Sequence, residues 1–250
     1  MKSGKCFDFS AEFYDLLYKD KDYERETDFV EEVFSAYGKP KSVLEVGCGT
    51  GNYTRILCQR GYEVWGLDFS EKMLYAAKKK CECVFHVGDA RSFSLNKKFD
   101  ACVSLFAVMG YMNADSDVKS ALQNIRDHLA DGGLFVFDVW NGLAVMHTLP
   151  ETRVKEVEND DCKVIRVARP TLKPQNHLCV VNYAYSVLNK KTQLLSESSE
   201  SHCVRYFFPQ EIRVFLEQAG FEVLKICPFL DFSGMVDESV WNMAVVARAV

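Results

Sequence analysis

The chain has 250 residues, 48% of them apolar and 26% charged, which is the composition of a globular protein with room for one α/β domain. Because the net charge is −5 and no basic tract exceeds Lys78–Lys80, electrostatic capture of nucleic acid is disfavoured. No apolar run approaches the ~20 residues of a membrane-spanning helix, and the first residues lack a secretory signal's apolar core, so we expect a protein with no membrane partner.

Apolar periodicity predicts alternating helices and strands as far as Trp140. An amphipathic helix is expected over 24–37, ended by Gly38-Lys39-Pro40. Further helices are expected at about 52–60, 69–80 and 115–129, between strands at 42–46, 63–67, 83–87, 99–105 and 134–139. Strands connected by helices in this way form a parallel sheet, and ligands bind at the carboxyl ends of its strands.

The pattern changes after Trp140, where strand-like alternation replaces helical periodicity. We expect strands at 154–157, 164–168, 178–188 and 202–208, then a helix at 209–219 and closing strands at 221–227 and 242–248. The predicted fold is a doubly wound, mostly parallel, seven-stranded Rossmann-like sheet with an antiparallel β insert after the fifth strand. Residues 1–150 and 209–250 would form the core, and 151–208 a substrate cap over its mouth. An apolar cap face needs cover from the core or from a second subunit, so a homodimer is one option.

Ten cysteines are scattered along the chain without a C-x-x-C pair. Cys81 and Cys83 are close in sequence, but the second pair that a zinc site needs is missing. Cys102, Cys179 and Cys227 lie in apolar runs and are expected to be small buried side chains. We therefore expect reduced structural thiols in a cytoplasmic protein, and no metal site.

The most informative segment is 43–51, Val-Leu-Glu-Val-Gly-Cys-Gly-Thr-Gly, in which a predicted strand ends in a glycine-rich turn. Such a turn brings backbone N–H groups close to a ligand. Dinucleotide folds use G-x-G-x-x-G against a pyrophosphate, which a carboxylate such as Glu45 would repel. A carboxylate suits a cationic ligand, and S-adenosylmethionine carries a sulfonium and an ammonium. The turn therefore predicts S-adenosylmethionine rather than a nicotinamide dinucleotide; the alternative is a purely structural turn.

Acidic or apolar residues also follow the next three predicted strands. Asp68, about 20 residues beyond the turn, can accept both ribose hydroxyls. Asp89 can accept a hydrogen bond from an adenine amine, and Leu105 and Phe106 can offer backbone and an apolar wall. Either aspartate alone could be a helix N-cap, but their order at successive strand ends favours a ligand site.

These motifs resemble those of class I S-adenosylmethionine-dependent methyltransferases. Residues 43–51 resemble the first motif, 66–74 the second, 88–90 the third and 99–106 the fourth. The resemblance implies S-adenosylmethionine as the cofactor and a small-molecule acceptor. The cofactor contacts that it implies, beside those named above, come from Gly47, Cys48, Gly49, Phe69, Met73 and Ala90.

A narrower resemblance is to N-methyltransferases of nucleotide-linked deoxyaminosugars, carried by 13–18, 21–23, 109–111 and the β-rich insert. It implies that Tyr14 and Tyr23 lie over the cofactor and Tyr111 beside the acceptor. Tyr14 could instead be a core or surface aromatic. Where that family often has Glu-Pro-Trp-Trp, this chain has Asp-Val-Trp-Asn at 138–141, with Trp140 expected near the acceptor.

Methyl transfer needs alignment, and a base only if the acceptor arrives protonated. Tyr111 is the first candidate to orient or accept that proton. Tyr14 and His202 are further catalytic candidates, and His177 is a weaker one. Arg166, Arg169 and Arg205 could face a diphosphate or be solvated strand residues. The sequence leaves open O- or carboxyl-methylation of another small metabolite, or a non-catalytic cofactor-binding relative.

Overall fold

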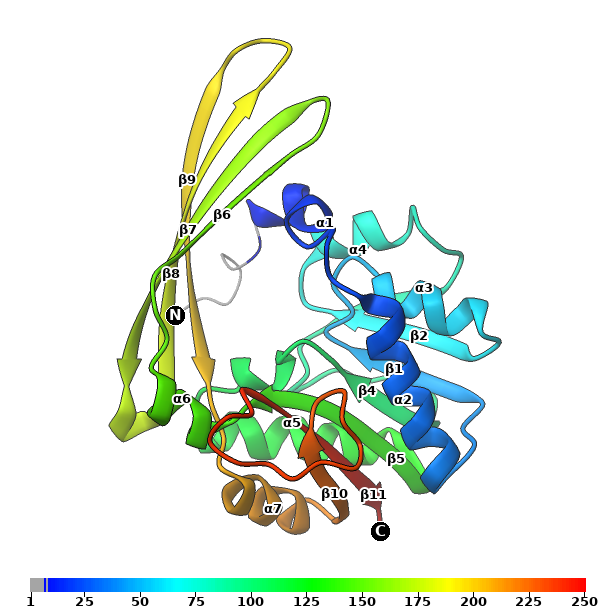
Figure 1. The fold of residues 1–250 in the computed structure, drawn as a ribbon. Coiled ribbons are helices and arrows are strands. Elements are labelled where there is room, and N and C mark those ends of the chain that lie inside the picture. The colour runs from blue at the N-terminus through cyan, green and yellow to red at the C-terminus, as the bar shows by residue number, and fades with distance from the viewer. Residues whose placement is uncertain (1–6, 8) are drawn as a thin grey trace.

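The computed structural model describes residues 7 and 9–250, which form two sheets (Figure 1). Within these residues the larger sheet has seven strands in the order β10-β11-β5-β4-β1-β2-β3. β11 runs antiparallel to both β5 and β10, whereas β1, β2, β3, β4 and β5 pair in parallel. Its strands are β1 Ser42–Val46, β2 Glu63–Asp68, β3 Val84–Val87, β4 Phe99–Ser104, β5 Leu129–Trp140, β10 Phe221–Pro228 and β11 Asn242–Ala249. The predicted fold class is confirmed.

Helices cover both faces of this sheet: α2 Tyr23–Tyr37, α3 Asn52–Gln59, α4 Glu71–Ala77, α5 Asp115–Asp127 and α7 Pro209–Gln218. One core packs Leu122 of α5 and Leu216 of α7 against Phe135 of β5. The other packs Phe29 of α2 and Leu57 of α3 on the opposite face. Among the described helices, none is long and apolar enough to cross a membrane.

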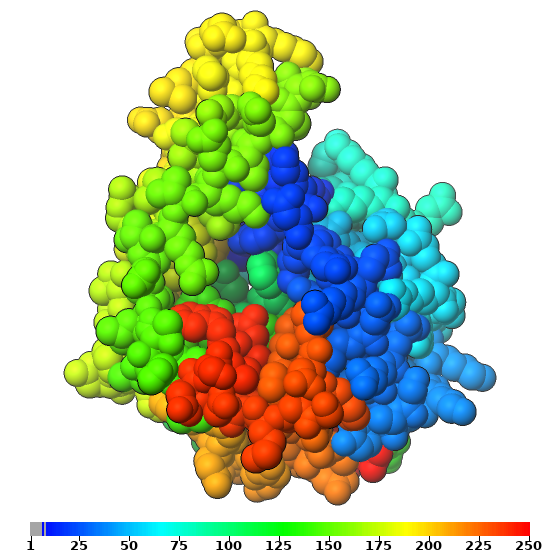
Figure 2. Space-filling view, viewed as in Figure 1, coloured from blue at the N-terminus to red at the C-terminus, as the bar shows by residue number. Residues whose placement is uncertain are grey.

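The second sheet is antiparallel, in the order β6-β7-β8-β9, and stands beside the first as a long blade (Figure 1). Its strands are β6 Arg153–Glu158, β7 Cys162–Lys173, β8 Leu178–Asn189 and β9 Leu195–Arg205. The N-terminal helices η2 (Ser10–Phe13) and α1 (Tyr14–Leu17) lie between blade and core, as Figure 2 shows in blue. Leu17 is buried against Val164 and Val187, so the N-terminal segment fastens the blade's inner face.

Five elements were not predicted: η2 and α1, and the three short helices described next. α6 (Gly142–Thr148) follows Asn141, whose side chain caps it by accepting the Leu143 N–H at 3.1 Å. The short helix η3 (Val108–Tyr111) follows β4, and η4 (Pro174–Asn176) forms the β7–β8 turn. β9 begins at Leu195 rather than 202, because its Ser- and Glu-rich first half pairs with β8 through backbone without apolar alternation.

The cysteine predictions are partly confirmed. Cys102, Cys179 and Cys227 are fully buried. The structure corrects one expectation: Cys58 of α3 and Cys83 bring their sulfur atoms into contact as a disulfide.

Candidate cofactor and acceptor site

The glycine turn after β1 is built on left-handed backbone, with φ of +76°, +53° and +74° at Gly47, Gly49 and Gly51. A Cβ at Gly47 would lie 2.5 Å from Val108, and one at Gly51 would lie 2.9 Å from Ala77. A Cβ at Gly49 would meet nothing within 4 Å. Gly47 and Gly51 are therefore required by packing, whereas Gly49 faces open space in which a ligand fits.

The N–H groups of this turn are engaged inside the protein, which corrects the expectation that they face the ligand. Gly47 and Cys48 both donate to the Leu67 carbonyl, at 2.7 and 3.0 Å, and Gly51 donates to Cys48. A pyrophosphate site needs unpaired N–H groups, so this pairing argues against a dinucleotide. Burial raises the pKa of the Cys48 thiol well above its usual value, so Cys48 is a small turn residue and no nucleophile.

Asp68 is buried at the end of β2, and its carboxylate holds the glycine turn in place. It accepts the N–H of Gly49 at 2.8 Å and that of Ser70 at 2.8 Å. The N-cap of α4 is Ser70, which accepts the Met73 N–H at 3.3 Å. Burial raises the pKa of Asp68, against the lowering effect of these backbone donors. The simple N-cap alternative for Asp68 is therefore wrong.

Glu45 departs from its predicted place. Its side chain is 1% exposed and accepts a hydrogen bond from the Thr54 hydroxyl of α3. Burial raises its pKa to about 8, although the Thr54 hydrogen bond lowers it. Glu45 lies on the central strand β1 and faces the helix rather than the mouth of the sheet. The structure thus gives it a partner in the core instead of the expected cationic ligand.

Asp89 follows β3, as predicted, but its carboxylate is paired with Arg91. The Arg91 Nε donates to Asp89 at 2.9 Å, and the same guanidinium reaches Asp117 at 3.1 Å. This pairing lowers the pKa of Asp89. The neighbouring Ala90 uses its carbonyl to accept from Asn124 at 3.2 Å. An adenine amine would have to share Asp89 with Arg91.

The N-terminal helix is tied to the glycine turn by Asp15. Its carboxylate accepts from Thr50 and Lys80 at 2.7 Å each and from Asn52 at 3.1 Å, a cluster that sequence analysis missed. This anchor ties the helix that carries Tyr14 to the turn. The Tyr14 ring lies 4.8 Å from that of Tyr18, and burial raises the pKa of Tyr14 well above the usual value.

Tyr23 begins α2, with its ring 5.0 Å from that of Tyr53. Its buried hydroxyl has no hydrogen-bond partner among the described residues. A buried polar group without a partner calls for an explanation, and a bound ligand is one. This orphaned hydroxyl and the open side of Gly49 both fit the predicted cofactor.

Asp138 shapes the backbone at the end of β4. In the sequence it stood out only because residues 138–141 differ from the aminosugar family's motif. Phe106 and Ala107 have φ of +68° and +58°, and both donate their N–H groups to the buried carboxyl of Asp138. Burial raises the pKa of Asp138 to about 7. Asp138 therefore positions the Phe106–Ala107 backbone.

The acceptor candidates Tyr111, on η3 of the core, and His202, on β9 of the second sheet, lie in contact. The Tyr111 hydroxyl lies 2.8 Å from His202 Nδ1. The Phe7 ring lies 4.8 Å from that of His202 and 6.1 Å from that of Phe69, next to Asp68. One aromatic ring thus touches both the predicted cofactor side and the predicted acceptor side.

Residues 43–133 match the model of the methyltransferase domain family. Over these residues the chain is similar to a methyltransferase domain. Two curated relatives, a dTDP-3-amino-3,4,6-trideoxy-alpha-D-glucopyranose N,N-dimethyltransferase of Streptomyces venezuelae and a dTDP-3-amino-3,6-dideoxy-alpha-D-glucopyranose N,N-dimethyltransferase of Streptomyces fradiae, are 36% and 35% identical. The matches cover 52% and 55% of this chain and 56% and 57% of the relatives, so the chain spans little more than half their length.

Solved structures extend the likeness over the whole fold. Streptomyces venezuelae DesVI is 26% identical with a TM-score of 0.80, over 96% of this chain and 98% of that one. A methyltransferase from Clostridium acetobutylicum has the same TM-score at 20% identity, over 96% and 97% of the two chains. The second sheet is thus shared with these structures and is not an addition of this chain alone.

The predicted acceptor residues are not all brought together. Arg166 lies on the inner face of β7 and donates to the Tyr18 hydroxyl at 2.9 Å. Arg169, three residues on, is exposed on the outer face. Arg205 is buried in ion pairs with Asp115 and Glu211. Of the three arginines, Arg166 alone lies beside the N-terminal helix.

Two further candidates, Trp140 and His177, contact side chains other than Tyr111. The ring of Trp140, at the end of β5, packs against Trp241 at 5.6 Å. His177 lies 3.4 Å from Glu211, in the β7–β8 turn region. Their roles toward an acceptor stay predictions.

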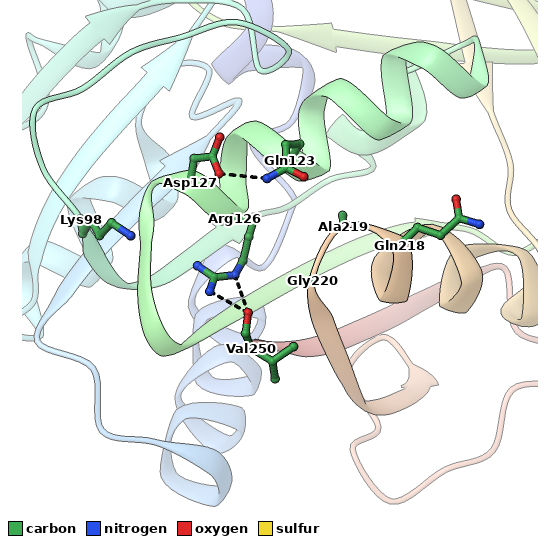
Figure 3. A pocket seen from close by; sticks show the side chains of 8 residues that line it. All are labelled: Lys98, Gln123, Arg126, Asp127, Gln218, Ala219, Gly220 and Val250. Atoms are coloured by element: carbon green, nitrogen blue, oxygen red, sulfur yellow. Dashed lines mark hydrogen bonds between the residues drawn. The ribbon is translucent and has the colours of Figure 1, made fainter.

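A hollow of about 490 Å³ lies away from this site, at the opposite end of the sheet (Figure 3). It is lined by Lys98, Arg126 and Val250, among others, and the Arg126 guanidinium donates to the Val250 oxygen at 2.7 Å. None of the predicted site residues lines it. We assign it no part in cofactor or acceptor binding.

Proposed function

We propose that this chain is an S-adenosylmethionine-dependent methyltransferase that methylates the amino group of a nucleotide-linked deoxyaminosugar. The single observation that carries the proposal is the position of Phe7. Its ring contacts Phe69 beside the cofactor candidates and also His202 and Tyr111, at 4.8 and 5.8 Å. The proposed cofactor side, at Phe69, and the proposed acceptor side, at Tyr111 and His202, are therefore separated by about one aromatic ring. This spacing suits direct transfer from cofactor to acceptor. The curated relatives' names support the substrate class.

The cofactor supplies an activated methyl group, so the protein's task is alignment and exclusion of water. Asp68 can accept the ribose hydroxyls. Tyr14 and Phe106 supply apolar walls, and Asp15 keeps the N-terminal helix over the glycine turn. Holding acceptor and methyl group in line is worth up to roughly 7–11 kcal/mol.

Proton handling falls to Tyr111 and His202. An amine resembling an α-amino group has a pKa of about 8, so about a tenth is neutral at pH 7. The Tyr111 hydroxyl, already bonded to His202, can accept a hydrogen bond from that amine. Such help contributes roughly 10²–10⁴ in rate.

Arg166 is our candidate for the diphosphate. Its guanidinium meets the rings of Tyr18 and Tyr183 at 5.4 and 5.1 Å, and its Nε has no partner among the described residues. A buried donor of this kind suits a phosphate oxygen. Residues 151–208 then act as the substrate cap.

We further propose a cytoplasmic homodimer. The outer face of the second sheet carries Val154, 66% exposed, beside the half-buried Ile165 and Val167. A second copy would cover these side chains. Sedimentation equilibrium tests this, and a monomer at micromolar concentration would contradict it.

The function is tested by incubating the chain with S-adenosylmethionine and a dTDP-3-amino-3-deoxyhexose, followed by mass spectrometry of the sugar nucleotide. We expect the mass of one or two added methyl groups. The matched control is the 3-hydroxy sugar nucleotide. Methylation of that control and not of the amine would establish the alternative, an O-methyltransferase.

A further inference from the structure

Glu200 extends the Tyr111–His202 pair into a buried chain of three groups. Glu200 and His202 lie two residues apart on β9, so both point to its inner face, and they are 7% and 3% exposed. His202 Nε2 lies 3.3 Å from Glu200 Oε2, while Nδ1 lies 2.8 Å from the Tyr111 hydroxyl. These three hydrogen-bonded side chains thus connect the second sheet to η3 of the core.

The charge of Glu200 sets the direction of both hydrogen bonds. Burial alone would raise the Glu200 pKa, but His202 and the backbone N–H of Ser10 lower it to about 2. An ionised carboxylate can only accept, so the proton of the neutral imidazole lies on Nε2. Nδ1 is then the acceptor, and the Tyr111 hydroxyl must donate to it.

We propose that Glu200 is a positioning residue that fixes the Nε2–H form of His202 and so turns the Tyr111 oxygen toward the acceptor amine as a proton acceptor. The inference rests on the proposed N-methylation. The amine lone pair forms the N–C bond as the C–S bond breaks, and that bond's electron pair stays on sulfur. The ammonium proton passes to the Tyr111 oxygen as the Tyr111 proton passes to His202 Nδ1. The resulting imidazolium stays paired with the Glu200 carboxylate.

Glu200 also holds the N-terminal segment. Its other oxygen, Oε1, accepts the N–H groups of Phe9 and Ser10 at 2.8 and 3.0 Å. One carboxylate therefore sets the state of His202 and anchors the segment that carries Phe7 over it. These two roles need a variant that separates them.

Glu200→Gln separates them because its carbonyl oxygen can still accept from Phe9 and Ser10. Its amide NH₂ then faces His202 Nε2, which must become the acceptor. The imidazole proton moves to Nδ1 and donates to Tyr111, which reverses the hydrogen bond between them. Glu197→Gln makes the same change three residues away on the exposed outer face of β9 and is the matched control.

The first test is ¹⁵N NMR of the full chain, labelled at its five histidines and saturated with S-adenosylhomocysteine. His202→Asn assigns the His202 signals. We expect the Nε2–H form in the unchanged protein and in Glu197→Gln, and the Nδ1–H form in Glu200→Gln. An Nδ1–H form in the unchanged protein overturns the proposal whether or not the variant folds.

The second test is steady-state kinetics with the aminosugar nucleotide. Loss of the proton relay predicts a kcat at least about tenfold lower in Glu200→Gln, with both KM values within about threefold and partial recovery in Glu200→Asp. An unchanged kcat overturns the proposal. Because NMR needs no turnover, a chain that methylates another acceptor would fail the proposed function while leaving the His202 assignment to be judged by its spectra.

Discussion

Asp68 accepts the N–H of Gly49 at 2.8 Å, so the carboxylate at the end of β2 fixes the glycine turn at the end of β1. The two motifs that sequence analysis took separately are therefore one unit. Gly49 faces open space on the side where a ligand fits, with the Asp68 carboxylate beneath it. The cofactor assignment depends on this pair more than on Glu45, which faces the core.

Asp68→Ala is expected to weaken S-adenosylhomocysteine binding by at least about tenfold. Two charge-assisted hydrogen bonds to ribose, at about 1.5–3 kcal/mol each, are lost, and the Gly49 anchor is lost with them. The control is Ser70→Ala, which removes the α4 cap and should cost ~1 kcal/mol of stability with affinity intact. Calorimetry and thermal melting on both variants decide the matter; equal affinity in Asp68→Ala and the unchanged protein would refute the ribose contact.

Arg166→Ala should raise the KM for the sugar nucleotide about tenfold or more and leave cofactor affinity unchanged. The reason is its inward position and unpartnered Nε. Arg169→Ala is the matched control, since Arg169 lies on the same strand but on the exposed outer face. Equal effects of the two substitutions would remove the physical support for a diphosphate at Arg166.

Glu45→Gln should flatten the pH dependence of stability and spare cofactor affinity. The folded-state pKa of Glu45 is raised from 4.5 to about 8, so between these values the unfolded state ionises more readily. Stability from this group is therefore lost as pH rises from about 4.5 to 8. Glutamine does not ionise, so the variant should be more stable at pH 8 by more than about 1 kcal/mol.

Denaturant titrations at pH 5 and pH 8 measure that difference, with the exposed Glu82→Gln as control. The Glu45→Gln variant and the unchanged protein should differ at pH 8 and agree at pH 5. A large loss of S-adenosylmethionine affinity in Glu45→Gln would restore the original prediction of a direct contact.

Asp15→Ala should release α1 from the glycine turn and speed S-adenosylhomocysteine dissociation by about tenfold, which corresponds to 1.4 kcal/mol. Lys80→Ala should act in the same direction, because Lys80 donates to Asp15. Asp20→Ala is the control, since its contact is an exposed one to Lys155 at 3.8 Å. Stopped-flow displacement measures the dissociation rates. An unchanged rate in Asp15→Ala would show that the anchoring of α1 to the glycine turn does not hold the cofactor in place.

Periodicity predicted the core of this fold because its strands and helices alternate with clear stops. β1 was placed at its observed limits, and α7 to within a residue. It failed where backbone pairing rather than side-chain burial makes the element. The first half of β9 is polar on both faces, and α6 depends on one capping residue, Asn141.

Strand order predicted correctly that Asp68 lies at a strand end beside the glycine turn. The resemblance named Tyr14 and Tyr111, and their roles toward a ligand stay predictions. Glu200 was not predictable, because its partners come from the distant N-terminal segment. The grouping of Arg169 with Arg166 was wrong, because residues three apart on a strand face opposite sides of the sheet. In the sequence, Asp138 stood out only as a difference from the aminosugar family's motif. Its hydrogen bonds to the backbone after β4 depend on the pairing of β4 with β5.

Calorimetric titration of the chain with S-adenosylhomocysteine and, separately, with NAD tests the central claim most directly. The paired N–H groups of the glycine turn and the open side of Gly49 predict one-site binding of S-adenosylhomocysteine and no heat from NAD. Tight NAD binding without S-adenosylhomocysteine heat would contradict the methyltransferase assignment.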